Sequence, residues 1–267
     1  MSSAIATLSG RVAVITGGAS GIGRATAKLL AEHGIRVFVG DYRLRPENLE
    51  PFRSLGIQAT ECDVRNVADL QRLVDSAANA TGRLDILVNN AGIGMVKQIT
   101  EVTESDWDNA LDTNLKAAFF GSKSAIPHFL KVGGGCIVNI ASNAGLLPRA
   151  HDPVYSISKL ALVGLTKSLA LCHAKDRIRI NAVCPGPVGD TGMMNDDLDA
   201  APDRTFAEQQ IIAASPMAKA LGRMTDPAEI AAAVLYLVSD AACMVTGTAL
   251  AIDGGKSLGV PPKLRPQ

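Results

Sequence analysis

Short apolar runs alternate along the chain with longer stretches in which apolar residues recur at helical spacing. Several of the runs lack any polar alternation, as expected of strands that are buried on both faces of a sheet. The runs predict seven strands: Val12–Thr16, Val37–Gly40, Gln58–Cys62, Ile86–Asn89, Cys136–Ala141, Arg179–Val183 and Ala249–Ile252. The longer stretches predict helices over Gly23–His33, Val67–Thr81, Glu104–Leu130, Val154–Ala174 and Pro227–Ser239. This alternation indicates an α/β fold, a doubly wound sheet of about seven parallel strands with helices on both faces.

Three segments depart from this rhythm. Pro46 and Pro51 weaken the helical pattern after the second strand, which predicts a short helix or an irregular crossover. Residues 189–216 interrupt the βα alternation and are expected to form a substrate flap, and residues 259–267 are expected to be an irregular tail. No linker, repeat or low-complexity tract divides the chain, so residues 1–267 are expected to form a single domain.

Composition excludes several classes of partner. The chain has 26 basic and 26 acidic residues with no block of like charge, whereas nucleic-acid binding relies on clustered Lys and Arg. No signal-like N-terminus and no run near about 20 apolar residues is found, so we expect neither secretion nor a membrane span. The five cysteines are scattered, and four are expected to be small buried residues, which favours a reducing, cytoplasmic location.

A glycine-rich turn follows the first predicted strand and opens the first helix. Within Ile15–Gly23, Gly17 can take the tight turn, Gly21 permits close approach of a pyrophosphate, and Gly23 permits close packing of the helix on the sheet. The N-terminus of the helix offers free N–H groups to the anion. The segment therefore predicts a dinucleotide site.

A tyrosine and a lysine four residues apart are the candidate catalytic group. Tyr155 and Lys159 share one face of a predicted helix. A free tyrosine has a pKa of about 10, and a nearby ammonium lowers the pKa because it stabilises the tyrosinate. On its own this spacing more often marks a partly exposed helix face, so its meaning depends on the surrounding motifs.

These motifs, in this order, resemble the short-chain dehydrogenase/reductase (SDR) family. The resemblance covers about Gly10 to Gly255 and rests on Thr16–Gly23 (T-G-x-x-x-G-x-G), Asn89–Gly92, Asn114, Ser142, Tyr155–Lys159 and Pro185-Gly186. It implies a single-domain Rossmann-like fold and an NAD(H)-dependent oxidoreductase that transfers a hydride between nicotinamide and a secondary alcohol or ketone. It also implies a homotetramer, with a dimer as the alternative, in which Glu104–Leu130 and Val154–Ala174 pack across one interface.

The resemblance also implies roles for single residues. Ser142 would hydrogen-bond the substrate oxygen, Tyr155 would act as general acid/base, and Lys159 would tune the tyrosine and contact the ribose. Asn114 resembles the family residue that kinks its helix and holds a water; the alternative is a mid-helix residue that bonds locally. No metal is expected, since the four histidines form no cluster.

The nicotinamide cofactor is expected to be NAD. Asp41 ends the second strand, where a carboxylate accepts hydrogen bonds from ribose hydroxyls and repels the extra phosphate of NADP. Ser20 is neutral where NADP-preferring relatives often carry a basic residue, while Arg43 and Arg45 argue the other way; Asp41 could also simply form a turn. The expected cofactor-binding residues are Gly17, Ser20, Gly21, Ile22, Gly23, Asp41, Asp63, Val64, Asn90, Ala91, Gly92, Tyr155, Lys159, Pro185, Gly186, Val188 and Thr191.

Two of these assignments carry an alternative. Asn90 is expected to serve as much as a tie between strands as a ligand. Thr191 lies six positions beyond Pro185 rather than the usual five, as though Gly189 were inserted, which weakens its assignment to the nicotinamide.

Substrate selectivity is expected from three loops, residues 94–98, 143–153 and 189–216. Arg149, His151 and Asp152 either bind a polar or anionic substrate or face solvent, and solvent is favoured. Met193 and Met194 are candidates for an adaptable apolar wall. Polyols, hydroxy acids, steroid-like alcohols and 3-oxoacyl compounds all remain open.

Two other functions remain alternatives. Epimerases and dehydratases share the Tyr-Lys spacing but usually add a C-terminal substrate domain. A catalytically silent NAD-binding regulatory or interaction protein on the same fold should have lost one of the four catalytic positions, yet all four are present.

Overall fold

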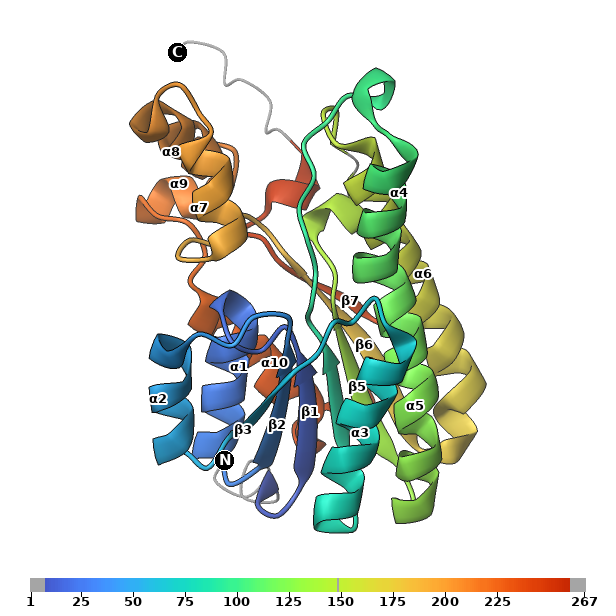
Figure 1. The fold of residues 1–267 in the computed structure, drawn as a ribbon. Helices are drawn as coiled ribbons and strands as arrows, with labels where there is room; N and C mark the ends of the chain where they lie inside the picture. Colours follow the sequence, from blue (N-terminus) through green and yellow to red (C-terminus); the bar gives the residue numbers. More distant parts are fainter. Residues whose placement is uncertain (1–7, 148, 260–267) are drawn as a thin grey trace.

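The computed structural model describes residues 8–147 and 149–259, and most of the predicted tail lies outside them. At its centre is a seven-stranded parallel sheet of order β3-β2-β1-β4-β5-β6-β7 (Figure 1). The strands are β1 (Val12–Thr16), β2 (Arg36–Asp41), β3 (Gln58–Glu61), β4 (Ile86–Asn89), β5 (Gly135–Ile140), β6 (Ile178–Pro185) and β7 (Ala249–Ile252). The predicted fold class is confirmed. Strands from the first and the last part of the described chain belong to this one sheet.

Helices cover both faces of the sheet (Figure 1). One face carries α1 (Gly21–Glu32), α2 (Pro46–Ser54) and α10 (Pro227–Val238), and the other carries α3 (Val67–Thr81), α5 (Ala117–Val132) and α6 (Pro153–His173). The remaining helices are α4 (Glu104–Leu111), α7 (Gly192–Asp199), α8 (Arg204–Ala213) and α9 (Pro216–Leu221). Short 3₁₀ turns cover Ile99–Glu101, Asn143–Gly145, Ala174–Asp176, Asp240–Ala242 and Lys256–Leu258.

The central strands supply two hydrophobic cores at once. In β1, Ala13 and Ile15 face the core beneath α1 and α10, whereas Val12 and Val14 face the core beneath α3 and α5. Successive side chains of a strand point to opposite faces, so a strand covered on both sides must be apolar at every position. This is why the predicted strands are unbroken apolar runs.

Prolines begin four of the described helices, α2, α6, α9 and α10. Pro46 is the first residue of α2, so the crossover is a helix rather than an irregular segment. Pro227 is the first residue of α10, and Asp226 before it accepts a hydrogen bond from the N–H of Ala228. The carboxylate of Glu229 accepts the N–H of Asp226 at 2.7 Å, which completes a capping box.

The predicted helix Glu104–Leu130 is interrupted. Residues Asp112–Lys116 form a π-helical turn between α4 and α5. Such turns are rare and often lie at functional sites, because one widened turn shifts the side chains that follow it. Asn114 lies within this turn, which agrees with the expected kink.

Two sequence-based expectations are corrected. The sequence predicts no apolar segment long enough to cross a membrane, but Pro153–Asp176 is long and apolar enough by length and composition. Half of its most apolar window is buried in the fold, as in a core helix. Three cysteines are buried rather than four: Cys62, Cys136 and Cys184, with Cys172 and Cys243 exposed.

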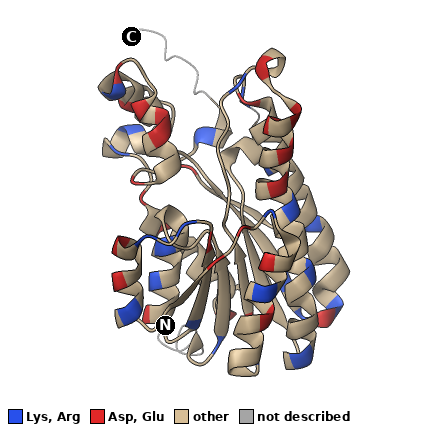
Figure 2. Cartoon of the chain, in the orientation of Figure 1, with Lys and Arg blue, Asp and Glu red and all other residues tan. Residues whose placement is uncertain are grey.

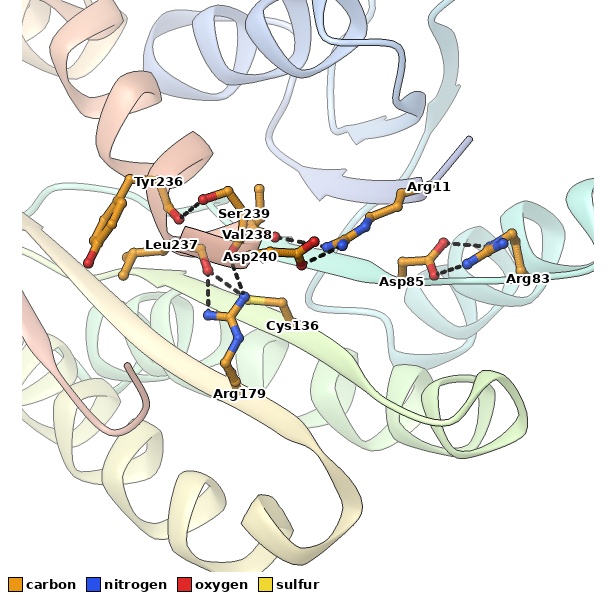
Figure 3. Close-up of polar contacts among 10 residues, drawn as sticks. All are labelled: Arg11, Arg83, Asp85, Cys136, Arg179, Tyr236, Leu237, Val238, Ser239 and Asp240. Atoms are coloured by element: carbon orange, nitrogen blue, oxygen red, sulfur yellow. Dashed lines mark hydrogen bonds and ion pairs between the residues drawn. The ribbon is translucent and has the colours of Figure 1, made fainter. Parts of the chain in front are cut away.

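Charged side chains of both signs are interspersed along the helices (Figure 2). Two of the arginines lie at the amino ends of strands and bind the end of α10 (Figure 3). Arg179 donates to the carbonyl oxygens of Leu237 and Ser239, and Arg11 donates to that of Val238 at 3.2 Å. The last carbonyl groups of a helix have no partner within it, so these guanidinium groups cap the C-terminus of α10.

Candidate active site

The carboxyl ends of the central strands open onto one cavity of about 530 Å³. The order of the strands reverses between β1 and β4, and ligands of open α/β sheets bind in the crevice at such a switch point. Of the predicted site residues, all except Gly23 and Asn114 line this cavity. The structure therefore brings together residues as far apart in the sequence as Gly17 and Thr191.

The glycine turn has the shape that the sequence predicts. Gly17 takes a positive φ of 62°, and a Cβ there would lie 2.8 Å from the Cα of Ala91. A Cβ on Gly23 would lie 2.1 Å from the carbonyl oxygen of Gly17, so Gly23 packs the helix on the turn rather than lining the cavity. Ser20 precedes α1 without a side-chain cap, which leaves the first N–H groups of the helix for an anion.

Asn90 holds this turn against β4. Its Nδ2 donates to the carbonyl oxygens of Thr16 at 3.0 Å and Gly17 at 2.7 Å. Its backbone N–H donates to the Oγ1 of Thr16 at 3.1 Å. The tie between strands that the sequence suggested is present, and it engages the Nδ2 group of the side-chain amide.

Asp41 connects the end of β2 to the glycine turn. Its Oδ2 accepts the N–H of Ala19 at 2.9 Å, and its Oδ1 accepts the N–H of Arg43 at 3.2 Å. The second bond is the turn-forming contact that was the alternative interpretation of this residue. Each carboxylate oxygen can accept a further hydrogen bond, and Asp41 lines the cavity, so both roles are compatible.

A neighbouring group of residues borders the same end of the cavity. Arg65 forms a two-pronged ion pair with Asp63, through Nε at 2.9 Å and Nη2 at 2.7 Å, and this pairing lowers the pKa of the Asp63 carboxyl. The guanidinium carbon of Arg65 lies 5.4 Å from the ring centroid of Tyr42. Sequence reasoning missed Tyr42 and Arg65, although each directly follows a predicted strand end or site residue.

Ser142, Tyr155 and Lys159 line one wall of the cavity. Tyr155 and Lys159 are buried one turn apart on α6, with the Nζ of Lys159 5.8 Å from the ring centroid of Tyr155. The Nζ also donates to the carbonyl oxygen of Ile140 at 3.1 Å. A hydroxyl, a phenol and an ammonium thus share one water-poor wall.

Burial dominates the protonation of this group. Burial raises the pKa of Tyr155, while a hydrogen bond from Ser142 and the charge of Arg149 lower it. Burial also lowers the pKa of Lys159 from 10.5 to about 8. In the chain alone, removal from water outweighs the charges that lower the pKa of Tyr155. A low pKa of Tyr155 beside Lys159 therefore stays a prediction for the enzyme with NAD bound.

The side chain of Asn114 bonds outside its own helix, to the backbone of Ile93 after β4 and to the Oγ of Ser158 on α6 at 3.1 Å. Its Oδ1 accepts the N–H of Ile93 at 2.8 Å, and its Nδ2 donates to the carbonyl oxygen of Ile93 at 3.0 Å. A Cβ on Gly92 would lie 3.1 Å from that Oδ1 and 3.2 Å from the Nζ of Lys159. Asn114 thus holds the segment after β4, and Gly92 leaves room for the lysine.

The extra residue before Thr191 is absorbed in a turn. Asp190 takes a positive φ of 51°, which few residues other than glycine, asparagine and aspartate adopt. Thr191 then caps α7 by accepting the N–H of Met194 at 3.2 Å, and its methyl group faces Gly21. Thr191 therefore lies over the glycine turn despite its displaced position in the sequence.

Comparison with known proteins agrees with this geometry. Residues 17–257 match the family model described as enoyl-(acyl carrier protein) reductase. The chain belongs to the short-chain dehydrogenase/reductase family. It is therefore an oxidoreductase of the SDR type.

Individual SDR proteins match along nearly the whole chain. It is 39% identical to 4-formylbenzenesulfonate dehydrogenase of Comamonas testosteroni, over 94% of this chain and 99% of that protein. It is 39% identical to cis-4-hydroxycyclohexanecarboxylate dehydrogenase of Sinomonas cyclohexanicum, over 92% and 96%. The solved structure of ligand-free aldohexose dehydrogenase from Thermoplasma acidophilum superposes with a TM-score of 0.88 at 32% identity, covering 98% of this chain and 99% of that chain.

The SDR motifs do not extend to the substrate side of the cavity. Of the three charged residues that precede Tyr155, Arg149 alone lines the cavity, with its guanidinium carbon 4.9 Å from the ring centroid of Tyr155. His151 is exposed and contacts Gln98, whereas Asp152 is buried and ion-paired with Arg149.

The flap contributes Met193 and Met194, as expected, and also Asp197. Lys256 lines the cavity from beyond β7. Sequence reasoning missed Asp197 and Lys256, although Lys256 follows a strand end and two glycines, where site residues of this fold gather.

Proposed function

We propose that this SDR chain is an NAD(H)-dependent dehydrogenase that interconverts a secondary alcohol and a ketone, with Tyr155 as general acid/base. The observation that carries the proposal is the wall formed by Ser142, Tyr155 and Lys159, which faces the same cavity as the glycine turn and Asp41. One of the relatives is named as the dehydrogenase of a ring alcohol, which supports this reaction class.

The turn at Gly17 fits a dinucleotide because no side chain there could be accommodated and the N–H groups of α1 are uncapped. Asp41 favours NAD, since two backbone N–H groups hold its carboxylate at the end of β2, where it would repel a phosphate on the ribose. When bound, NAD(H) supplies the nicotinamide that exchanges a hydride with the substrate carbon.

The remaining chemistry belongs to the chain itself. Ser142 holds the substrate oxygen and, through its hydrogen bond to Tyr155, favours the tyrosinate. Tyr155 takes the hydroxyl proton during oxidation and returns it during reduction. Lys159 places a cation near the phenol ring, where it favours the same deprotonated form.

The test is NADH formation at 340 nm with a panel of secondary alcohols, for wild type and Tyr155→Phe. General acid/base groups contribute roughly 10²–10⁴-fold, so we expect kcat/KM to fall by at least about 100-fold in the variant. The variant should still bind NADH, which fluorescence measures. Tyr236→Phe, at a partly exposed tyrosine on α10, is the matched control.

The cofactor is tested in the same assay. Wild type should prefer NAD over NADP, and Asp41→Ser should narrow that preference. A wild-type preference for NADP would overturn the cofactor assignment. Bound NADH without turnover of any alcohol or ketone would instead support the catalytically silent alternative.

A further inference from the structure

Lys256 places a cation in the wall of the cavity that holds Tyr155, and the described residues offer it no ion-pair partner. It begins the 3₁₀ turn that follows β7, and its side chain is partly buried. Within the described part of the chain, its ammonium forms no side-chain hydrogen bond or ion pair. A buried charge normally has a partner, because removing an ion from water is costly.

The neighbouring charges are engaged elsewhere. Arg149 is ion-paired with the buried Asp152. Asp253 accepts the N–H groups of Gly255 at 2.9 Å and Ser257 at 2.8 Å, so its carboxylate is bound by backbone. Burial and the charge of Arg149 lower the pKa of Lys256, while Asp253 and Asp152 raise it. Among the described residues, no carboxylate therefore forms an ion pair with the ammonium of Lys256.

We propose that the substrate of this dehydrogenase carries a carboxylate or a sulfonate, and that Lys256 binds this anion while Tyr155 faces the reacting hydroxyl. The inference rests on the proposed function, since it names the substrate class of the same site. An anion at Lys256 would replace the water that the lysine loses and would fix the orientation of the alcohol.

The position of Lys256 favours the substrate over the phosphates of the cofactor. Two of the three charged groups that act on it, Arg149 and Asp152, also act on Tyr155, and Arg149 lies over the tyrosine ring. The glycine turn that fits a pyrophosphate follows β1, on the other side of the sheet's switch point. The kinetic experiment below must separate an anionic group of the substrate from the phosphates of the cofactor.

Asp197 is the acidic residue of the flap in the same cavity. Burial raises its pKa, and among its neighbours Arg149 lowers it. Its electrostatic neighbours are Arg149, Asp196 and Asp152 rather than Lys256. Asp197 therefore interacts with Arg149 and does not neutralise Lys256.

The experiment compares two ring alcohols that differ by one charge, cis-4-hydroxycyclohexanecarboxylate and cyclohexanol, at saturating NAD. Lys256→Met should lower kcat/KM for the carboxylate by about tenfold to a hundredfold, as expected for a lost hydrogen bond to an ion, and leave cyclohexanol unchanged. Lys256→Glu should lower it further. Lys219→Met, at an exposed lysine on the nearby α9, is the control for a general loss of charge.

Each result decides the inference. Equal losses for both alcohols in Lys256→Met, or no loss for the carboxylate, would overturn it. A raised KM for NAD with both alcohols would assign the lysine to the cofactor instead. A wild type that oxidises cyclohexanol but rejects the carboxylate would overturn the substrate class while the proposed function stands.

A binding measurement covers the case in which neither alcohol turns over. Cyclohexanecarboxylate should then bind the enzyme–NADH complex more tightly than cyclohexanecarboxamide, and Lys256→Met should abolish the difference. Equal affinities of wild type for the carboxylate and the carboxamide would overturn the inference. Failure of a wider alcohol panel, by contrast, counts against the proposed function.

Discussion

At the scale of single residues, the buried Lys159 lowers the stability of the fold, although the proposed catalysis requires it. Its ammonium is buried with the carbonyl oxygen of Ile140 as a hydrogen-bond partner, and burial lowers its pKa from 10.5 to about 8. A pKa that is lower in the folded chain means that the unfolded chain binds the proton more tightly. The loss of folding stability caused by the buried ammonium is therefore fully present below pH 8, and it disappears as the pH rises from about 8 to 10.5.

We predict that Lys159→Met stabilises the fold while it removes activity. At pH 7 the free energy of unfolding should rise by about 1–3 kcal/mol, the pKa shift less the lost hydrogen bond, and the gain should vanish near pH 10.5. Urea denaturation at both pH values measures this free energy, with Lys28→Met at an exposed position of α1 as control. A variant less stable than wild type at pH 7 would contradict the cost of this buried charge.

Much of the site could be predicted because its motif residues follow strands. The carboxyl ends of neighbouring parallel strands meet at one edge, so Gly17, Asp41 and Ser142 had to lie close together once the strands were found. Lys256 and Asp197 could not be selected in this way, since charges in loops usually face solvent. The raised pKa of Tyr155 also escaped prediction, because burial depends on packing between distant segments.

At the scale of elements, strands were easier to predict than the break in a helix. Burial on both faces leaves a clear apolar run, as in β4. The π-helical turn at Asp112–Lys116 gives no such signal, because one widened turn hardly changes the apolar period. Its cause is tertiary: Asn114 bonds to the backbone of Ile93 after β4.

The cap of α10 offers a test at this scale. Arg179→Met should lower the free energy of unfolding by about 1–3 kcal/mol, because it removes charged donors from two carbonyl oxygens at the end of the helix. Arg53→Met removes a largely exposed ion pair and should change the free energy of unfolding by about 0.5 kcal/mol or less. Denaturant midpoints compare the two. Because Arg179 lies at the amino end of β6, away from the cavity, turnover well below the midpoint should be unchanged.

At the scale of the whole molecule, the outer surface of two helices is unusually apolar. Leu160 and Leu171 on α6 are 57% and 84% exposed, and Ile157 on α6 and Phe119 on α5 are also exposed. These positions explain why half of the apolar helix is not buried in the fold. Large exposed apolar side chains commonly mark protein–protein contacts when they gather on one surface, as the homotetramer implied by the family resemblance would require.

We predict that this surface is one of the two-fold interfaces of a tetramer. Light scattering after size-exclusion chromatography should give the mass of four chains for wild type. The double variant Leu160→Glu, Leu171→Glu should give dimers, because two charges facing their own copies across a two-fold axis repel, while the second interface survives. Lys28→Glu, at an exposed position of α1 on the opposite face of the sheet, should remain a tetramer. A wild type that elutes as a monomer, or a double variant of unchanged mass, would show that the apolar stripe on α6 has another partner.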